Sequence, residues 1–367
     1  MSPVLTLPWE GSSLVSADFI ATLRCPRCLH EKEGLLRLER GNWLICQEPG
    51  CGRKYPIRNG IPLMLTEEGE KWINIEVEQL PANLLPAGPT MPDPAWLGRK
   101  ANELRITILE MAVRAGGGHI GGAFSIIDVM TALYFQFRVF RHDPSDPSWP
   151  ERDRLVFSKG HGCLALYVVL ADTGYFRKSR LHEFCVDGGL LGGHPERGHI
   201  PGVEVTTGSL GHGLSQAVGM GLANRMDGTK SRIFVVLSDG ECNEGSVWEA
   251  FMSAAQHRLD CLTAIIDSNK MESLGLTKEI MNIEPLGDRL RSFGWAVRDI
   301  NGHDMDEIVA ALESVPFEAG KPSAIVAHTV KGKGVSFMEN KPMWHYRAPN
   351  REEARKALAE LCTALEP

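Results

Sequence analysis

Apolar residues in the second half of the chain follow two alternating periods, which predict strands and helices in turn. Three short runs are apolar on both faces and rich in β-branched residues: 233–239, 262–267 and 323–328. Between them, apolar residues recur at helical spacing in three stretches: 246–257, 284–294 and 304–314. Fully apolar strands alternating with helices predict an α/β fold, with a parallel sheet covered by helices on both faces.

Two further helices are predicted at the borders of this region. Apolar residues at helical spacing precede three glycines at 116–118, which would end the first helix: Leu104, Ile108, Met111 and Ala115. Near the end of the sequence, Asn350 and Glu353 have the spacing of a capping box. The helix that follows would have one apolar face: Ala354, Leu358, Leu361 and Leu365.

The first part of the sequence has a different pattern, in which cysteines form two pairs: Cys25 and Cys28, then Cys46 and Cys51. Between the pairs, "LLRLERGNWLIC" alternates apolar and polar residues, which predicts a β-hairpin that turns at 40–42. Four cysteines at this spacing are typical of tetrahedral Zn²⁺, and a closed ligand set predicts a structural ion. Redox-active or unliganded thiols are the alternative. The segment resembles the small zinc ribbons appended to other enzymes and to methyltransferase activators.

Domain boundaries follow from these patterns and from the prolines that crowd "LPANLLPAGPTMPDPAW". Prolines at this density exclude regular helix and indicate a linker. We expect five segments, which are a tail, a zinc ribbon, a Pro-rich linker, a large domain and a C-terminal helix: 1–20, 21–66, 67–97, 98–349 and 350–367.

Charge and composition exclude some partners. The net charge of -7, from 39 Lys+Arg against 46 Asp+Glu, leaves no basic excess of the kind that nucleic-acid binders carry. The start of the chain lacks the pattern of a secretory leader, and no apolar run has the length of a membrane span. The five remaining cysteines are scattered singly, as reduced thiols are. We therefore expect a soluble, cytoplasmic protein with neither nucleic acid nor membrane as a partner.

Polar residues mark the ends of two neighbouring predicted strands. Asp239 ends the run at 233–239, and Asn269 follows the next run. Ligands of parallel sheets bind beyond the carboxyl ends of the strands, so both side chains could project into one crevice. A carboxylate and an amide oxygen suit Mg²⁺ bound together with phosphates. The alternative is a helix-capping aspartate and a turn asparagine.

Histidine stands beside glycine in three further stretches. These are "AGGGHIGGAFS" with His119, "VFSKGHGCLALY" with His161 and "GLLGGHPERGHIPGVEVTTGSLGHG" with His194. Glycine beside a polar side chain permits close approach of the backbone to a ligand. A single such pair is more often a turn, but several in one domain indicate a site.

The ordered motifs from about Arg105 to Pro349 resemble the N-terminal, cofactor-diphosphate-binding half of a transketolase. "SDGECNEG" followed by "DSNKM" resembles the family's metal-diphosphate motif. The resemblance implies thiamine diphosphate bound through Mg²⁺, or Ca²⁺ or Mn²⁺ in its place. The metal ligands it implies are Asp239, Asn269 and the backbone carbonyl of Met271. Ser238 departs from the family, which usually has glycine there.

The resemblance also implies roles for other residues. His161 and His345, the latter in "ENKPMWHYRAP", would contact the diphosphate and the reacting sugar, and His119 and His194 would line the substrate channel. Glu244 would communicate across a subunit interface and completes the expected catalytic set. The backbone of the loop "TTGSLGHG" would meet the aminopyrimidine ring. The expected cofactor-binding set is His161, Gly208, Ser209, Leu210, Asp239, Gly240, Glu241, Asn269 and His345.

A full transketolase continues into a pyrimidine-binding domain and a C-terminal domain, whereas this sequence stops after the predicted final helix. In the family, those domains carry the glutamate that completes cofactor activation and the arginines that grip sugar phosphates. We therefore expect one subunit of a split transketolase that moves a two-carbon ketol unit between sugars or sugar phosphates. A second chain of roughly 300 residues would complete it, in an α2β2 heterotetramer. Two alternatives are one chain of a pyruvate-using synthase and a non-catalytic scaffold or regulatory subunit.

Overall fold

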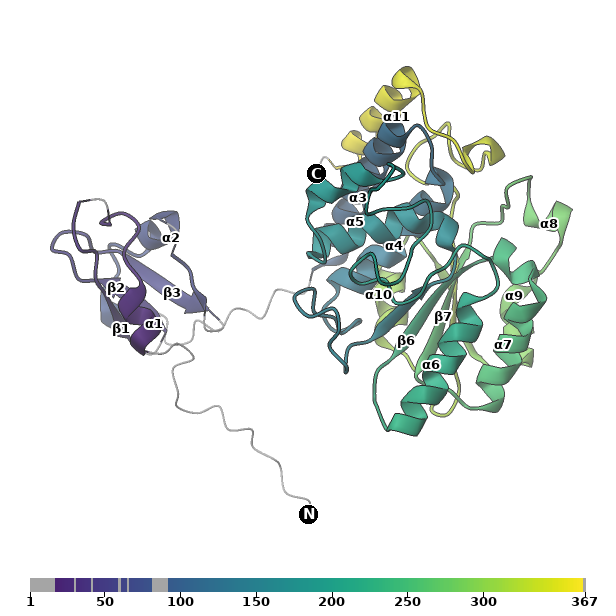
Figure 1. The fold of residues 1–367 in the computed structure, drawn as a ribbon, viewed down its shortest axis with the longest axis horizontal. Helices are drawn as coiled ribbons and strands as arrows, with labels where there is room; N and C mark the ends of the chain where they lie inside the picture. Colours follow the sequence, from purple (N-terminus) through teal and green to yellow (C-terminus); the bar gives the residue numbers. More distant parts are fainter. Residues whose placement is uncertain are drawn as a thin grey trace, which may run out of the picture. The chain divides into compact units, whose positions relative to one another are not determined.

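The computed structural model describes residues 17–29, 31–40, 42–58, 61–64, 66–80 and 92–365. The chain divides into two compact units, Met1–Thr90 and Met91–Pro367 (Figure 1). Each unit has its own core, and each is described by itself.

The first unit is built on a small antiparallel sheet. Its strands pair in the order β1 (Leu36–Glu39), β2 (Trp43–Cys46), β3 (Lys54–Arg58) and β4 (Ile61–Pro62). The predicted hairpin is present, since Glu39 pairs with Trp43 across the turn. Arg40 has a φ of 51°, the left-handed conformation that tight turns of this kind use. Helices α1 (Ala17–Thr22) and α2 (Thr66–Lys71) and the turn η1 (Val77–Gln79) complete the unit.

The segment after residue 66 packs onto this sheet, although the sequence predicts a linker from residue 67. The buried ammonium group of Lys54 donates to the carbonyls of Gly52, Trp72 and Ile73 at 3.0 to 3.1 Å. Leu80 is 2% exposed. The sequence did not reveal this packing, because it depends on a lysine that satisfies three carbonyls, two of them far from it in the chain.

The second unit contains a five-stranded parallel sheet, which confirms the predicted fold class. Its strands lie in the order β5 (Arg154–Phe157), β6 (Ile233–Ser238), β7 (Leu262–Ser268), β9 (Ser323–His328) and β8 (Ala296–Asn301). The three predicted strands are the central ones, β6, β7 and β9, whose residues are almost all buried. The sequence pattern missed the two edge strands, since β5 is short and only Ala296 and Ile300 of β8 are buried.

Helices cover both faces of this sheet (Figure 1). On one face, α4 (Ile120–Phe135) packs against α3 (Pro94–Ala115), α5 (Cys163–Thr173) and α10 (Met305–Glu313), and α11 (Arg351–Thr363) packs on α3. The other face is covered by α6 (Gly213–Asp227), α7 (Gly245–Gln256) and α9 (Leu286–Ser292). The short elements are η2 (Gly160–Gly162), η3 (Lys178–Glu183), η4 (Gly240–Asn243), α8 (Thr277–Ile280) and η5 (Pro342–Trp344).

Two helices show how local sequence sets element ends. Helix α3 begins at Pro94, inside the expected linker, because proline is tolerated at a first helical position. Asp93 caps it, with its side chain accepting from Trp96 N at 2.6 Å. In α11 the predicted capping box is present. Its buried face consists of Ala357 and Leu361.

The predicted apolar face of α11 was partly wrong, because Leu358 is 38% exposed.

Among the helices that the structure describes, none is long and apolar enough to cross a membrane.

Candidate functional site

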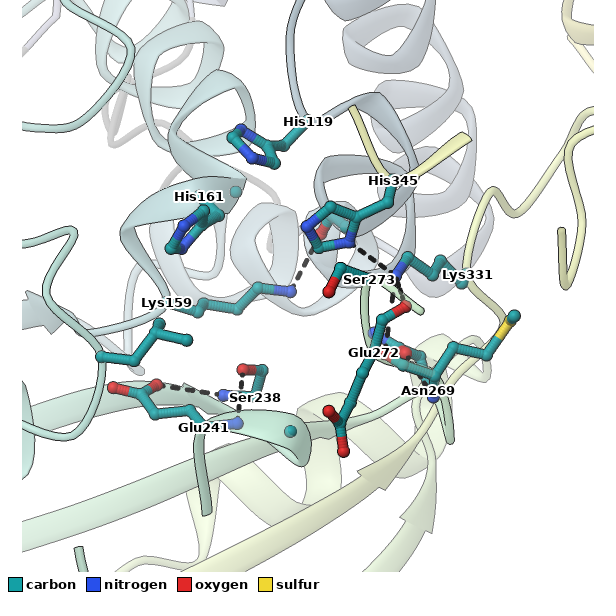
Figure 2. Close-up of a pocket in the computed structure, with 15 residues that line it drawn as sticks. His119, Lys159, His161, Ser238, Glu241, Asn269, Glu272, Ser273, Lys331 and His345 are labelled. Carbon is teal, nitrogen blue, oxygen red and sulfur yellow. Dashed lines mark hydrogen bonds between the residues drawn. The ribbon is translucent and has the colours of Figure 1, made fainter. Parts of the chain in front are cut away.

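A cavity of about 200 Å³ lies at the carboxyl ends of the central strands. Three histidines line one side, and the ends of β6 and β7 form the opposite side (Figure 2). Lys159 and Lys331 extend between the two sides. The lining residues are His119, Gly122, Lys159, His161, Gly162, Leu210, Ser238, Gly240, Glu241, Asn269, Met271, Glu272, Ser273, Lys331 and His345.

Asp239 and Asn269 follow neighbouring strands, as predicted. Ser238 pairs with Asp267 in the parallel register of β6 and β7, so both chain segments leave the sheet together. The carboxylate of Asp239 is 2% exposed and accepts hydrogen bonds from the backbone N–H groups of Gly240 (2.8 Å) and Lys270 (2.5 Å). Burial, and then the charge of Asp267, raise its pKa to about 7. Asp239 also caps the turn η4, so the alternative role as a cap holds as well.

A sharp turn after β7 turns backbone oxygen atoms toward the cavity. Lys270 has a φ of 64°, and Asn269 Oδ1 accepts from Met271 N at 3.1 Å. The carbonyl of Met271 lies 3.5 Å from Lys331 Nζ. Asn269 and Met271 line the cavity and flank Lys270, whose N–H binds the Asp239 carboxylate, although Asp239 is not itself among the lining residues. The three residues offer hard oxygen donors.

Lys159 and Asp267 form a buried ion pair beneath the cavity that the sequence reasoning missed. Asp267 is 0% exposed and also accepts from Ser125 Oγ (2.6 Å) and Thr329 Oγ1. Burial alone would raise the pKa of Asp267, but the ammonium of Lys159 outweighs it and keeps that pKa below its usual value. Lys159 also donates to Gly122 O at 2.9 Å, which joins this pair to α4.

Lys331 is the second cation that the sequence reasoning missed. Its ammonium donates to Glu272 O and lies against His345 Nδ1, both at 2.9 Å. Burial, and then the charge of Lys159, lower the pKa of Lys331 to about 8. The signal was present in the sequence, because Lys331 stands three positions after the predicted strand 323–328.

The four predicted histidines lie together. The ring of His119 has its centroid 4.7 Å from that of His161 and 5.2 Å from that of His345. His194 lies 4.8 Å from His161, measured in the same way. Burial, then neighbouring charges, lower the pKa of His119 to about 3 and that of His345 to about 4. Both rings are therefore neutral at pH 7 and can accept a proton.

The loop expected to meet the aminopyrimidine ring reaches the cavity through Leu210. Ser209 is exposed. Gly208 has a φ of 137°, and a Cβ there would lie 2.7 Å from the His194 ring, so glycine is required at this position.

Glu241 lines the cavity, but its carboxylate is engaged by the protein itself. It is 0% exposed and accepts from Ser158 Oγ, Gly211 N (2.9 Å) and Ser238 N (3.3 Å). The side chain thus joins the end of β5, the end of β6 and the loop at 208–211. Ser238, which departs from the family motif, accepts from Glu241 N through its hydroxyl at 3.2 Å.

Glu244 lies beside the loop at 208–211, with its side chain against Gly211, and its N–H donates to Glu241 O at 3.0 Å. It is exposed at the start of α7 and is not among the residues that line the cavity.

The four clustered cysteines converge in the first unit. Their sulfur atoms lie within 4.8 Å of one another. Over the residues that the structure describes, they form the one group of three or more His, Cys, Asp or Glu side chains placed to share a metal. Tyr55 Oη lies 3.1 Å from Cys25 Sγ and closes one side of the group.

Comparison with known proteins agrees with this geometry. Residues 98–362 match the family described as "Transketolase, thiamine diphosphate binding domain". The 6-deoxy-6-sulfo-D-fructose transketolase subunit SqwG of Clostridium sp. (strain MSTE9) is 48% identical over 265 residues, 72% of this chain and 96% of that protein. One of the subunits of the apulose-4-phosphate transketolase of Phocaeicola vulgatus is 42% identical over 262 residues, 71% of this chain and 92% of its own length.

Solved transketolases share the fold over the same part of the chain. The transketolase of Campylobacter jejuni has a TM-score of 0.68 and 34% identity, over 72% of this chain and 42% of that one. Human transketolase is 33% identical over 72% of this chain and 42% of its own length. The resemblance read from the sequence motifs is therefore confirmed. This chain belongs to the transketolase family and contains its thiamine diphosphate binding domain.

Proposed function

We propose that the chain is the cofactor-diphosphate-binding subunit of a two-chain transketolase, which transfers a two-carbon ketol unit from a ketose to an aldose. One observation carries the proposal. Within a single cavity at the strand ends, hard oxygen donors, two lysines and three histidines face one another. Oxygen donors and cations suit a metal-bound diphosphate, and neutral histidines suit proton transfer to a sugar.

The residues present fit thiamine diphosphate with a divalent ion. Asp239, Asn269 and the carbonyl of Met271 would hold Mg²⁺, or Ca²⁺ or Mn²⁺ in its place. The raised pKa of Asp239 supports this role, because burial and the charge of Asp267 disfavour the ionised carboxylate, which a bound cation would stabilise. Lys331 would contact the phosphates, and Lys159 would keep Asp267 neutralised beneath them.

When bound, thiamine diphosphate supplies the electron sink for breaking and re-forming a carbon–carbon bond. This chain's residues would bind and orient the sugar. His119 and His345, neutral near pH 7, would accept protons from its hydroxyls at a ring nitrogen, and His161 would hydrogen-bond beside them. His194 would support the loop at Gly208 against which it packs.

A partner chain would complete the site. The two relatives that are named as subunits align over almost their whole length, whereas human transketolase aligns over less than half of its own. We propose that a second polypeptide carries the pyrimidine-binding and C-terminal domains, in an α2β2 assembly with Glu244 at the interface. Exposed apolar side chains next to cavity residues suit such a partner: Leu274 at 86%, Met343 at 59% and Tyr346 at 62% exposure. These three residues are called the apolar rim below.

The substrates to test first carry a terminal anion. The relatives are named for a sulfonated ketose and for a ketose phosphate. A phosphate or sulfonate group on the donor is therefore the first choice, with free sugars as the comparison.

The four cysteines would hold a structural Zn²⁺. A closed set of four thiolates suits zinc and leaves no position for a substrate. We propose that the first unit docks the partner subunit or rigidifies the N-terminal part of the chain. Unchanged assembly and turnover after deletion of residues 1–75 would contradict this role.

The central experiment isolates the tagged chain from its native host under gentle conditions. The native mass should reveal a second chain of roughly 300 residues in equal stoichiometry, with thiamine diphosphate bound. This complex should transfer a ketol unit, followed by NMR of ¹³C-labelled donor, and Asp239→Ala should abolish transfer. Asp227→Ala, at an exposed aspartate ending α6, is the matched control. A partnerless chain without cofactor, or full activity of Asp239→Ala, would overturn the proposal.

A further inference from the structure

A histidine outside the cavity connects α4 to the loop that carries Lys331. His303 Nδ1 lies 2.6 Å from Asp128 Oδ2, and Val330 N–H donates to His303 Nε2 at 2.8 Å. Because Nε2 accepts a hydrogen bond, the ring proton is on Nδ1, where it is donated to Asp128. One neutral ring therefore joins a carboxylate of α4 to the peptide just before Lys331.

Asp128 is itself fixed from the other side. It is 5% exposed, and the Arg105 guanidinium of α3 donates to both of its oxygens. Burial alone would raise the pKa of Asp128, but Arg105 and His303 outweigh it and keep that pKa below its usual value. The carboxylate therefore stays ionised and holds His303 in one tautomer and one orientation.

The loop that carries Lys331 is attached through its backbone on both sides of Val330. Thr329 N–H donates to Ser268 O at 3.2 Å, and Asn340 N–H donates to Lys331 O at 2.9 Å. Thr329 Oγ1 also donates to Asp267, and Gly332 N donates to Gly121 O at 3.0 Å. Between them, the N–H of Val330 is held by His303, and its carbonyl accepts from Lys333 N at 3.1 Å. The next residue is Lys331, whose ammonium reaches Glu272 O and His345 Nδ1. Backbone position at Val330 therefore sets where this ammonium lies.

We propose that His303, oriented by Asp128 and Arg105, is a positioning residue that holds Lys331 against His345 in the cavity. The inference rests on the proposed function and extends it to residues away from the chemistry. Neither His303 nor Asp128 is among the residues that line the cavity. His303 reaches the loop of the cavity wall directly, because its ring accepts from Val330 N, one residue before Lys331.

Histidine suits this position for a geometric reason. Its ring carries a donor and an acceptor on opposite edges of a rigid plane, so it can bridge a carboxylate and a peptide N–H at once. Alanine offers neither group. His303→Gln retains a flexible amide with both a donor and an acceptor, and we expect it to position Lys331 in part.

The test measures the chemical reactivity of the Lys331 amine in the full-length chain. Competitive acetylation followed by mass spectrometry gives the labelling rate of Lys331 against pH. In the wild type, Lys331 should react slowly, because it is buried and its ammonium donates to Glu272 O. In His303→Ala the labelling rate at high pH, where the amine is deprotonated in both chains, should rise about tenfold, as expected when one buried hydrogen bond is lost.

The matched control is His328→Ala. His328 also pairs with an aspartate, Asp299 at 3.2 Å, but it is exposed. Lys331 labelling should be unchanged there. If His303→Ala does not fold, His303→Gln replaces it, with a smaller change of the same sign. Lys331 labelling equal to wild type in a folded His303 variant would overturn the proposal.

A double-mutant cycle separates positioning from general damage. If His303 acts through Lys331, then His303→Ala combined with Lys331→Met should weaken thiamine diphosphate binding by the assembled complex no more than Lys331→Met alone. Additive losses would contradict the inference. A wild-type complex that binds no cofactor would count against the proposed function, while the labelling result would still decide the role of His303.

Discussion

The ammonium group of Lys331 shares one cavity wall with a histidine and titrates near pH 8. A bound diphosphate would favour its charged form, so binding should take up a proton above that pH. We expect the affinity for thiamine diphosphate to fall as pH rises above 8, by up to about one log unit per pH unit. Calorimetry in two buffers of different ionisation enthalpy measures both effects.

Two variants of Lys331 test this role, one that keeps the positive charge and one that removes it. Lys331→Arg keeps its charge at every accessible pH, so its affinity should stay flat above pH 8. Lys331→Met should bind weakly at all pH values. A wild-type affinity that does not change between pH 7 and pH 10 would show that Lys331 does not contact the diphosphate.

Asp239 should show the opposite pH dependence. Without a metal, its pKa of about 7 means that the folded chain keeps a proton that the unfolded chain has lost above pH 3.8. Its contribution to stability is therefore lost as pH rises through 7. Mg²⁺ favours the ionised form, so Mg²⁺ affinity should rise up to pH 7 and then level off. Asp239→Asn should remove this dependence and cost roughly 10- to 100-fold in affinity. Proton release on Mg²⁺ addition, measured with an indicator dye, checks whether the ion displaces the proton of Asp239.

At the scale of elements, Glu241 holds three chain segments with one carboxylate. Glu241→Ala would leave the N–H of Gly211 and the hydroxyl of Ser158 unpaired. We expect a loss of about 1–3 kcal/mol of stability and faster hydrogen exchange at 207–211. Glu241→Gln, which keeps an acceptor, should lose less. Glu249→Ala, at a solvent-accessible glutamate of α7, is the control. Unchanged exchange in Glu241→Ala would refute the bracing role.

The cysteine group should hold the first unit together through its metal. Cys46→Ser or a strong chelator should release one equivalent of zinc and unfold the hairpin. Trp43 and Trp72, whose ring centroids lie 4.9 Å apart, report this through their fluorescence. Cys185→Ser, at an exposed thiol of the large unit, should change neither signal. An unchanged spectrum in the metal-free chain would mean that the core alone sustains the unit.

The helices and strands also explain which parts of the fold and of the site could be predicted from the sequence. The central strands were predictable because their apolar runs need no partner to be recognised, and their ends place Asp239 and Asn269. The edge strand β8 was not, since one of its faces meets solvent and breaks the apolar run. Lys159 and Asp267 were missed for another reason. They are 108 positions apart, and only the folded sheet pairs a lysine with a carboxylate that ends an apolar strand.

At the scale of the whole molecule, the apolar rim should decide assembly. Leu274→Asp places a charge beside the cavity mouth, where a partner would exclude water, and should weaken assembly by about 2 kcal/mol or more. Met226→Asp, at the end of α6 and 85% exposed in the wild type, is the matched control. Sedimentation of the mixed subunits measures the affinity of each variant for the partner chain. Equal affinities for the two variants would place the partner surface elsewhere.

The two lysines of the cavity have a consequence for the lifetime of the protein. Burial, and then the charge of Lys159, lower the pKa of Lys331, so the two ammonium groups repel each other in the folded chain. An anion between them relieves that repulsion only in the folded chain. Saturation at a hundred times the dissociation constant would add about 2.7 kcal/mol to the free energy of unfolding. Cells short of the vitamin would then degrade this protein faster, so its abundance would follow thiamine supply without any change in its synthesis.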